Sequence, residues 1–198
     1  MVAPAVAVAV AAGGLRYAPE DGGWIEYAAM GCWTGLILLV AAAGEEILVR
    51  GYPLRVLAER WGRWPALAAT SASFSALHGA NPGVGGVALL NILLAGVLLG
   101  IVCLKTGDLW WATGMHAGWN LATGFLADLP VSGIRLVDAP LVEVSGGGAA
   151  LWTGGDFGLE GGLAATLALA LAVTVVARTG IVPSRWPEVP VESNRENG

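Results

Sequence analysis

Charged residues are scarce in this sequence. Only 13% of its 198 residues are Asp, Glu, Lys or Arg, whereas 56% are hydrophobic. Residues 64–104 form a stretch of 41 residues without a charge, and residues 109–127 form another of 19. A water-soluble globule needs more polar surface than this, and an apolar run of about 20 residues is long enough to cross a bilayer. The composition therefore predicts an integral membrane protein that contacts membrane lipid.

Cysteines and basic clusters are also lacking. Cys32 and Cys103 both lie in apolar stretches, form no Cys-x-x-Cys pair and suggest no disulfide framework. The formal net charge is -5, and no block of Lys and Arg is interleaved with aromatic residues. This pattern excludes nucleic acid as a partner, because nucleic-acid binding needs a basic surface.

Five apolar stretches are long enough to be transmembrane helices. They lie at about residues 24–44, 65–81, 84–104, 109–129 and 159–177. Residues 2–15 are also apolar, but at 1.5 Å per residue they cover only about 20 Å of a hydrocarbon core about 30 Å thick. A signal peptide is less favoured there, because no basic segment precedes it. We expect an all-α, polytopic transmembrane bundle with five spans and a possible partial span at the N-terminus.

The expected spans divide the chain into five parts. These are a partial span with an outer loop (1–23), a membrane core (24–129), an extracytoplasmic loop (130–158), a last span (159–177) and a polar cytoplasmic tail (178–198). Cytoplasmic loops carry an excess of Lys and Arg. With residues 50–63 inside, eight of the ten Lys and Arg residues fall on that side. The count predicts a multi-pass protein of the cell membrane with a cytoplasmic C-terminus. We expect residues 130–160 to connect helices, with control of access to a site as the alternative.

Three of the expected helices carry ionisable or amide side chains at membrane depth. These residues are Glu45, Glu46, Arg50, His78, His116 and Asn120. Each costs about 2.5 to 3.5 kcal/mol on insertion scales, so each needs a partner or a task. Residues four apart share a helix face, so Glu46 can pair with Arg50. Glu45 is turned by about 100° from Glu46 and is left to face a different helix.

Each of these residues also has an ordinary structural explanation. Glu45, Glu46 and Arg50 can mark a helix end with a local ion pair, and one amide such as Asn91 needs no function. The set as a whole points to hydrolysis. A desolvated carboxylate suits a general base, and imidazole or amide N–H groups can donate to a developing oxyanion.

The spacing of these residues matches a known pattern. Glu45-Glu46-x-x-x-Arg50, Phe74-x-x-x-His78 and His116-x-x-x-Asn120, in this order, closely resemble the three motifs of the CPBP family of membrane proteases. This family (CAAX protease and bacteriocin-processing, or Abi) includes the type II CAAX prenyl endopeptidases, and the resemblance covers roughly residues 24–126.

The resemblance implies an intramembrane endopeptidase that cleaves a peptide or lipidated protein near the cytoplasmic side, without a cofactor. It implies that Glu45 and His78 activate a water, while His116 and Asn120 form the oxyanion hole. The supporting residues would be Glu46, Arg50 and Phe74.

Two alternatives remain open at this point. Glu45, His78 and His116 can bind zinc with a water in the fourth position, although the sequence has no His-Glu-x-x-His and Asn120 would lack a role. In the other alternative, the polar cluster binds a peptide or lipid without cleaving it, as in an immunity protein, or lines a proton path. Binding or flux would then survive the change Glu45→Gln.

Overall fold

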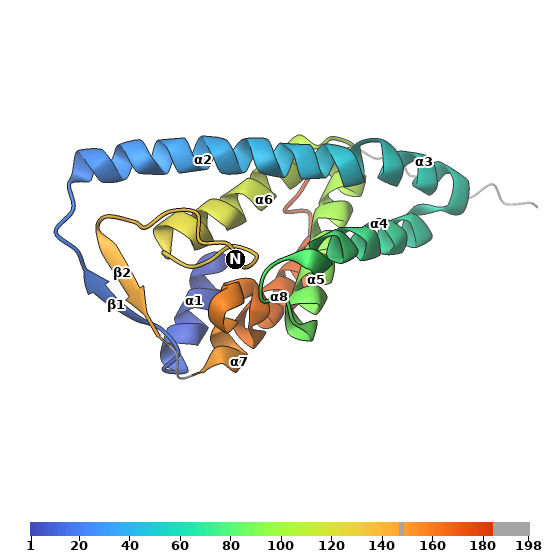
Figure 1. Ribbon diagram of the computed structural model, residues 1–198. Coiled ribbons are helices and arrows are strands. Elements are labelled where there is room, and N and C mark those ends of the chain that lie inside the picture. Colours follow the sequence, from blue (N-terminus) through green and yellow to red (C-terminus); the bar gives the residue numbers. More distant parts are fainter. Residues whose placement is uncertain (147–148, 184–198) are drawn as a thin grey trace, which may run out of the picture.

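The computed structural model describes residues 1–146 and 149–183, and these residues form a helical protein with one small sheet (Figure 1). The helices are α1 (Val2–Ala11), α2 (Trp24–Glu46), α3 (Tyr52–Trp61), α4 (Arg63–Leu77), α5 (Gly86–Thr106), α6 (Trp110–Leu121), α7 (Ala150–Thr153) and α8 (Leu163–Arg178). The strands are β1 (Arg16–Pro19) and β2 (Val142–Ser145). Most of the predicted polar tail, residues 184–198, lies outside the described residues.

The first predicted span does not end near residue 44. Helix α2 continues through a π-helical turn, Ile47–Gly51, into α3, and the whole segment of 38 residues is apolar enough to cross a bilayer. Hydropathy missed the extension because α3 carries Arg55, Glu59 and Arg60 on its outer side, while Leu54 and Ala58 are buried. A charged outer face ends an apolar run without ending a helix.

Two segments of the described chain are long and apolar enough to span a membrane, Trp24–Trp61 and Gly86–Thr106. The other three predicted spans correspond to shorter helices. With 15 and 16 residues, α4 and α8 are about 23 and 24 Å long, less than the hydrocarbon thickness of about 30 Å. Helix α6 has 12 residues and continues as a π-helical turn, Ala122–Leu126. The number of spans therefore stays a prediction.

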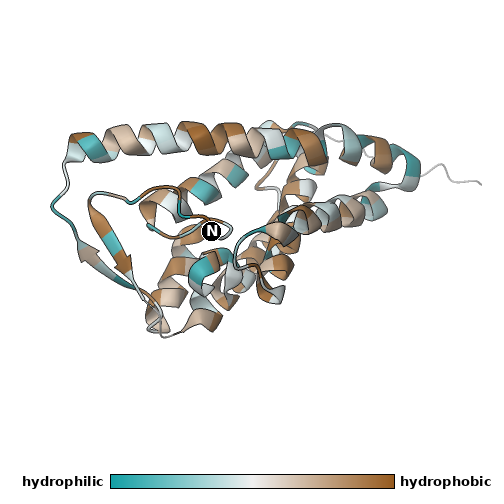
Figure 2. Ribbon diagram, viewed as in Figure 1, coloured by the Kyte–Doolittle hydropathy of each residue, from teal (hydrophilic) through white to brown (hydrophobic). Residues whose placement is uncertain are grey.

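The helices pack through close contacts between α4 and α5, α5 and α8, and α2 and α6. Glycines allow the first of these contacts. A Cβ atom at Gly96 of α5 would lie 3.1 Å from the Cα of Ser71 on α4. Helix α2 also has apolar side chains that no other part of the described structure covers. Trp33 is 64% exposed and Val40 is 66% exposed, and apolar residues recur along this helix (Figure 2). A large exposed apolar surface of this kind is suited to lipid.

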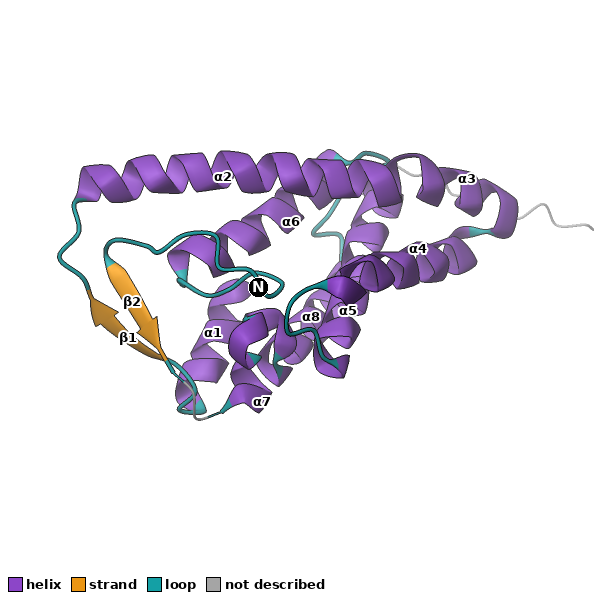
Figure 3. Cartoon of the chain, in the orientation of Figure 1, coloured by secondary structure: helices purple, strands orange, loops and turns teal. Residues whose placement is uncertain are grey.

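The prediction of an all-α fold with a simple outer loop was incomplete, because the structure also contains a two-stranded sheet. Strands β1 and β2 pair antiparallel, with Arg16 opposite Ser145 and Pro19 opposite Val142 (Figure 3). The hydroxyl of Tyr17 donates to the carbonyl of Ala127 at 3.1 Å, and burial, followed by the charge of Asp128, raises the pKa of Tyr17. Strands of four residues give too little alternation to be recognised in a sequence. The sheet ties the chain before α2 to the segment after α6.

Candidate active site

The predicted site residues come together where α2, α4 and α6 meet. Glu45 on α2, His78 just after α4, and His116 and Asn120 on α6 all line one cavity, together with Phe74. The cavity has a volume of about 460 Å³. Its remaining walls are mainly apolar, with Ile37, Leu38, Ala41, Leu48, Val49, Leu77, Val131, Ile134 and Leu136 among them.

Glu46 and Arg50 lie behind the cavity and are completely buried. Nη1 of Arg50 donates to Oε1 of Glu46 at 2.9 Å, as the four-residue spacing predicts. The Arg50 guanidinium also lies 4.1 Å from the ring centroid of Phe74, within cation–π range. Buried charges need such partners, because an unpaired one is costly. The motif residues Glu46, Arg50 and Phe74 thus form one packed unit.

His116 is oriented by that buried pair. Its Nδ1 lies 2.9 Å from Oε1 of Glu46. The same Oε1 already accepts from Arg50, so it acts as the acceptor and Nδ1 of His116 is assigned as the donor. Nε2 of His116 therefore points away from Glu46, and it lies 3.9 Å from Oε2 of Glu45.

His78 is also oriented by a hydrogen bond from its Nδ1, in this case to the main chain. Its Nδ1 lies 2.8 Å from the main-chain carbonyl of Phe74, four residues earlier. A carbonyl only accepts, so Nδ1 of His78 donates, and in the neutral ring Nε2 bears a lone pair. That Nε2 lies 3.8 Å from Oε2 of Glu45. The rings of Phe74 and His78 meet edge to face with centroids 4.7 Å apart, as expected for residues on one helix face.

Oε2 of Glu45 differs from the other unpaired buried atoms of the site, Oε2 of Glu46 and Nε of Arg50, because it lies near both imidazoles and belongs to a residue that lines the cavity. It is buried and has no hydrogen-bond partner within the described residues, although it faces both imidazoles. Distances of 3.8 and 3.9 Å to the two Nε2 atoms are too long for direct hydrogen bonds. Polar atoms separated in this way are commonly bridged by water. The Glu45 side chain as a whole is 40% exposed, so water reaches this side chain from the cavity although Oε2 itself is covered.

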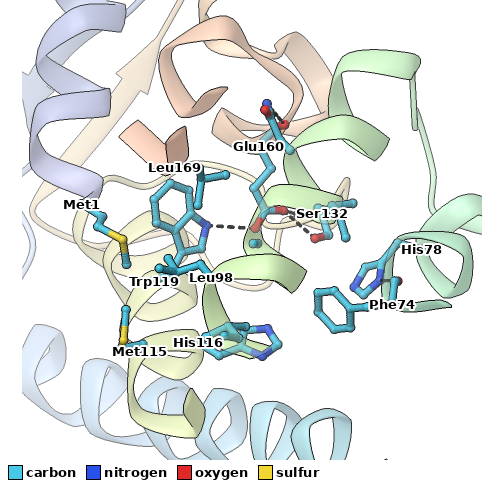
Figure 4. Close-up of a pocket in the computed structure, with 14 residues that line it drawn as sticks. Met1, Phe74, His78, Leu98, Met115, His116, Trp119, Ser132, Glu160 and Leu169 are labelled. Carbon is cyan, nitrogen blue, oxygen red and sulfur yellow. Dashed lines mark hydrogen bonds between the residues drawn. The ribbon is translucent and has the colours of Figure 1, made fainter. Parts of the chain in front are cut away.

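A second cavity lies behind the histidines. Phe74, His78, His116 and Ser132 line it too, together with Trp119 and Glu160 (Figure 4). The Glu160 carboxylate accepts hydrogen bonds from Nε1 of Trp119 at 2.9 Å, from the main-chain N–H of Ser132 at 2.9 Å, and from the Ser132 hydroxyl. Sequence patterns gave no sign of this group, because its members are far apart in the chain and belong to no common helix.

Asn91 on α5 needs no catalytic role, as the sequence suggested. Its Nδ2 donates to the carbonyls of Glu160 and Gly162, at 2.7 and 2.9 Å. Its Oδ1 accepts from the hydroxyl of Thr166 at 2.7 Å. These bonds satisfy the amide and fix the segment that precedes α8 against α5.

The segment after α6 does more than connect helices, contrary to the sequence-based expectation for residues 130–160. Val131, Ser132, Ile134 and Leu136 all line the cavity that contains Glu45. The expectation failed because the segment is held by side chains far away in the sequence. One of them is Asn81, whose Nδ2 donates to the Ser132 carbonyl at 3.1 Å.

Comparison with known proteins gives one match. A protein-family model described as type II CAAX prenyl endopeptidase Rce1-like matches residues 5–122. The match covers more than half of the chain and includes every site residue that the sequence predicted, but it ends before Ser132 and Glu160. No curated protein and no solved structure matches the chain.

Proposed function

Because the chain belongs to the type II CAAX prenyl endopeptidase Rce1-like family and is therefore a membrane protease, we propose that it cleaves peptide bonds with Glu45, His78, His116 and Asn120. The observation that carries this proposal is the unpaired Oε2 of Glu45, which lies within 3.9 Å of two imidazole nitrogens in an open cavity. The substrate in this proposal is a peptide or lipidated protein.

The first step of the proposed reaction is activation of one water. Both Oε2 of Glu45 and Nε2 of neutral His78 are acceptors, so a water between them donates one hydrogen to each. Its lone pairs are then free to attack the carbonyl carbon of the substrate. As the new C–O bond forms, Glu45 takes the proton and becomes the acid that protonates the leaving amine. The products are one peptide with a new carboxylate and one with a new amino group.

The second step concerns the oxyanion. Nδ1 of His116 already donates to Glu46, so Nε2 can donate to the oxyanion only when the ring is protonated on both nitrogens. In this proposal the ring is protonated on both nitrogens, with Oε1 of Glu46 at 2.9 Å from Nδ1 and Oε2 of Glu45 at 3.9 Å from Nε2. The amide of Asn120, four residues further along α6, supplies the second donor. Glu46 thus sets the orientation of His116.

The setting of the reaction is also part of the proposal. Residues 24–129 form the catalytic membrane core of a multi-pass protein with five spans and a partial one. The excess of Lys and Arg supports cleavage near the cytoplasmic face and a cytoplasmic C-terminus as parts of this proposal. The apolar walls at Ile37, Leu48 and Leu77 favour a hydrophobic or lipid-bearing substrate.

One observation favours a zinc-dependent variant of the same reaction as the second candidate. His78 and His116 each donate from Nδ1 to a fixed oxygen, as metal-bound histidines usually do. Zinc needs its nitrogen and oxygen ligands at about 2.0 to 2.2 Å. The observed separations of 3.8 and 3.9 Å would have to shrink by a few tenths of an ångström for a tetrahedral ion. We prefer the water-based mechanism without metal, because it also gives Asn120 a role.

The testing experiment is cleavage of quenched hydrophobic and farnesylated peptides by the purified protein in detergent. Wild type is compared with Glu45→Gln and with Glu143→Gln, a control at an exposed carboxylate of β2, each with and without a zinc chelator. Cleavage that is lost only in Glu45→Gln and resists the chelator supports glutamate catalysis. Loss on chelation supports zinc. Peptide binding without cleavage by wild type would indicate a binding protein instead.

A further inference from the structure

A strained turn forms one wall of the proposed active site. Val131 and Ile134 pair across the turn, and Ser132 between them has a φ of 49°. A residue with a side chain rarely adopts this left-handed conformation, because its Cβ approaches the neighbouring main chain too closely. Such strain persists only where the surroundings hold the backbone firmly.

The surroundings of Ser132 satisfy that requirement. Its main-chain N–H and its hydroxyl both donate to Oε2 of Glu160, and its carbonyl accepts from Nδ2 of Asn81. The next residue, Gly133, is packed so tightly that a Cβ atom there would collide with the carbonyl oxygen of Pro82. Asn81 and Pro82 closely follow His78. The turn is therefore fastened to the corner of the chain that carries a proposed catalytic imidazole.

The other oxygen of Glu160 reaches a second catalytic element. Oε1 accepts from Nε1 of Trp119 at 2.9 Å, and Trp119 is the neighbour of Asn120 on α6 (Figure 4). Glu160 is itself held, since its main-chain carbonyl accepts from Asn91 at 2.7 Å. The half-buried carboxylate thus joins the turn to α6 through three uncharged donors, and the main chain of the same residue is bonded to α5.

From this geometry we infer that Glu160 is a positioning residue of the active site, lying beyond the segment that the family model matches. It holds the Ser132 turn as the wall on which the substrate lies, and it holds Trp119 behind Asn120. The inference rests on the proposed function, because the wall is defined by the cavity that contains Glu45. Glu160 contacts no reacting atom and acts through Ser132 and Trp119.

The first test compares Glu160→Gln with wild type and with the exposed control Glu143→Gln. Gln keeps the size of the side chain, but its amide nitrogen cannot accept from Ser132. Loss of hydrogen bonds to a charged group should raise KM for a hydrophobic peptide by about tenfold or more, with a smaller change in kcat. Ser132→Ala should raise KM as well, and the double variant should do little more than Glu160→Gln alone. Wild-type KM in Glu160→Gln would overturn the inference.

The second test does not depend on cleavage. A nitroxide label is attached at Ile134→Cys, an exposed position of the turn, in a chain whose Cys32 and Cys103 are replaced by Ala. The label should become more mobile in Glu160→Gln and stay unchanged in Glu143→Gln. Unchanged mobility in Glu160→Gln overturns the inference, even if no peptide is cleaved by wild type and the proposed function fails. If Glu160→Gln does not fold, the same comparison is made with Ser132→Ala.

Discussion

At the scale of single residues, Glu45 and Glu46 are neighbours in the sequence with opposite environments. Glu46 is completely buried and bonded to Arg50 and His116, whereas Glu45 is partly exposed and its Oε2 is unpaired in the described structure. The difference follows from the helix, because adjacent residues point in directions about 100° apart. Oε2 of Glu46 is unpaired within the described residues as well, so the two carboxylates differ in what surrounds them: Glu46 is bonded through Oε1 to Arg50 and His116, whereas Glu45 faces the cavity and is available for proton transfer.

The first prediction concerns Glu45. We expect Glu45→Gln to lower kcat by about 10² to 10⁴-fold, because the amide cannot accept the proton of the attacking water. The thermal stability in detergent should remain close to that of wild type, since no hydrogen bond of Oε2 is lost in the described structure. Steady-state peptide cleavage and a melting curve measure both quantities. Full activity in Glu45→Gln would eliminate it as the base.

The second prediction concerns Arg50, for which we expect a loss of stability rather than a loss of kcat alone. Arg50→Met leaves Glu46 buried without its cation, and removal of one partner of a buried pair typically costs about 3 to 5 kcal/mol. We expect the free energy of unfolding to fall by that order, measured by denaturant titration in detergent. The matched comparison is Arg60→Met at an exposed position of α3, which should change stability by less than about 1 kcal/mol. Equal changes in the free energy of unfolding for the two variants would contradict a stabilising role of the buried Glu46–Arg50 pair.

The residue pairs that could be predicted from the sequence are local. Glu46 and Arg50, and Phe74 and His78, are four residues apart, so helix geometry alone brings them together. The contacts of Glu160 with Trp119 and Ser132 span 41 and 28 residues, and no periodicity links them. The convergence of Glu45 on the two histidines was expected from their chemistry and motif order. The position of the Ser132 turn in the cavity wall could not be predicted in that way, because it depends on these long-range contacts.

At the scale of elements, the packing of α4 on α5 determines where His78 lies. The helices touch at Gly96, where an added Cβ atom would lie 3.1 Å from both Cα and Cβ of Ser71. Gly96 also accepts a hydrogen bond from Arg50 through its carbonyl. A shift of α4 away from α5 would therefore move His78 relative to Glu45 and strain the buried ion pair.

The third prediction tests this packing. Gly96→Ala should destabilise the protein by about 1 to 3 kcal/mol, because the new methyl group meets main-chain atoms that cannot easily move. Cleavage should fall together with stability. Gly114→Ala on α6 is the control, since a Cβ atom there has nothing within 4 Å and alanine favours helix. The stability difference between the variants is measured by thermal unfolding in detergent, and its absence would contradict the tight contact.

At the scale of the whole molecule, hydropathy predicted where apolar helices occur but misplaced several of their ends. The predicted span at 65–81 corresponds to α4, which ends at Leu77 because His78 begins a different turn and Asn81-Pro82 stops the helix. The predicted span at 159–177 begins four residues later as α8, because Gly161 and Gly162 precede the helix. Apolar composition continues through such breaks, so a hydropathy window does not register them.

The last prediction concerns the orientation of the molecule. The excess of Lys and Arg predicts that α3 faces the cytoplasm and that residues 130–158 face outside. Single cysteines at Arg60 and at Asp138, which is 83% exposed, are introduced into a chain without Cys32 and Cys103. In intact cells, a membrane-impermeant maleimide should label Asp138→Cys and leave Arg60→Cys unlabelled until the cells are opened. Because Ser132 lies in the same segment as Asp138 and also lines the cavity, this labelling bears on the route by which a substrate reaches Glu45. The reverse labelling pattern would place α3 outside and would move the proposed cleavage to the outer face.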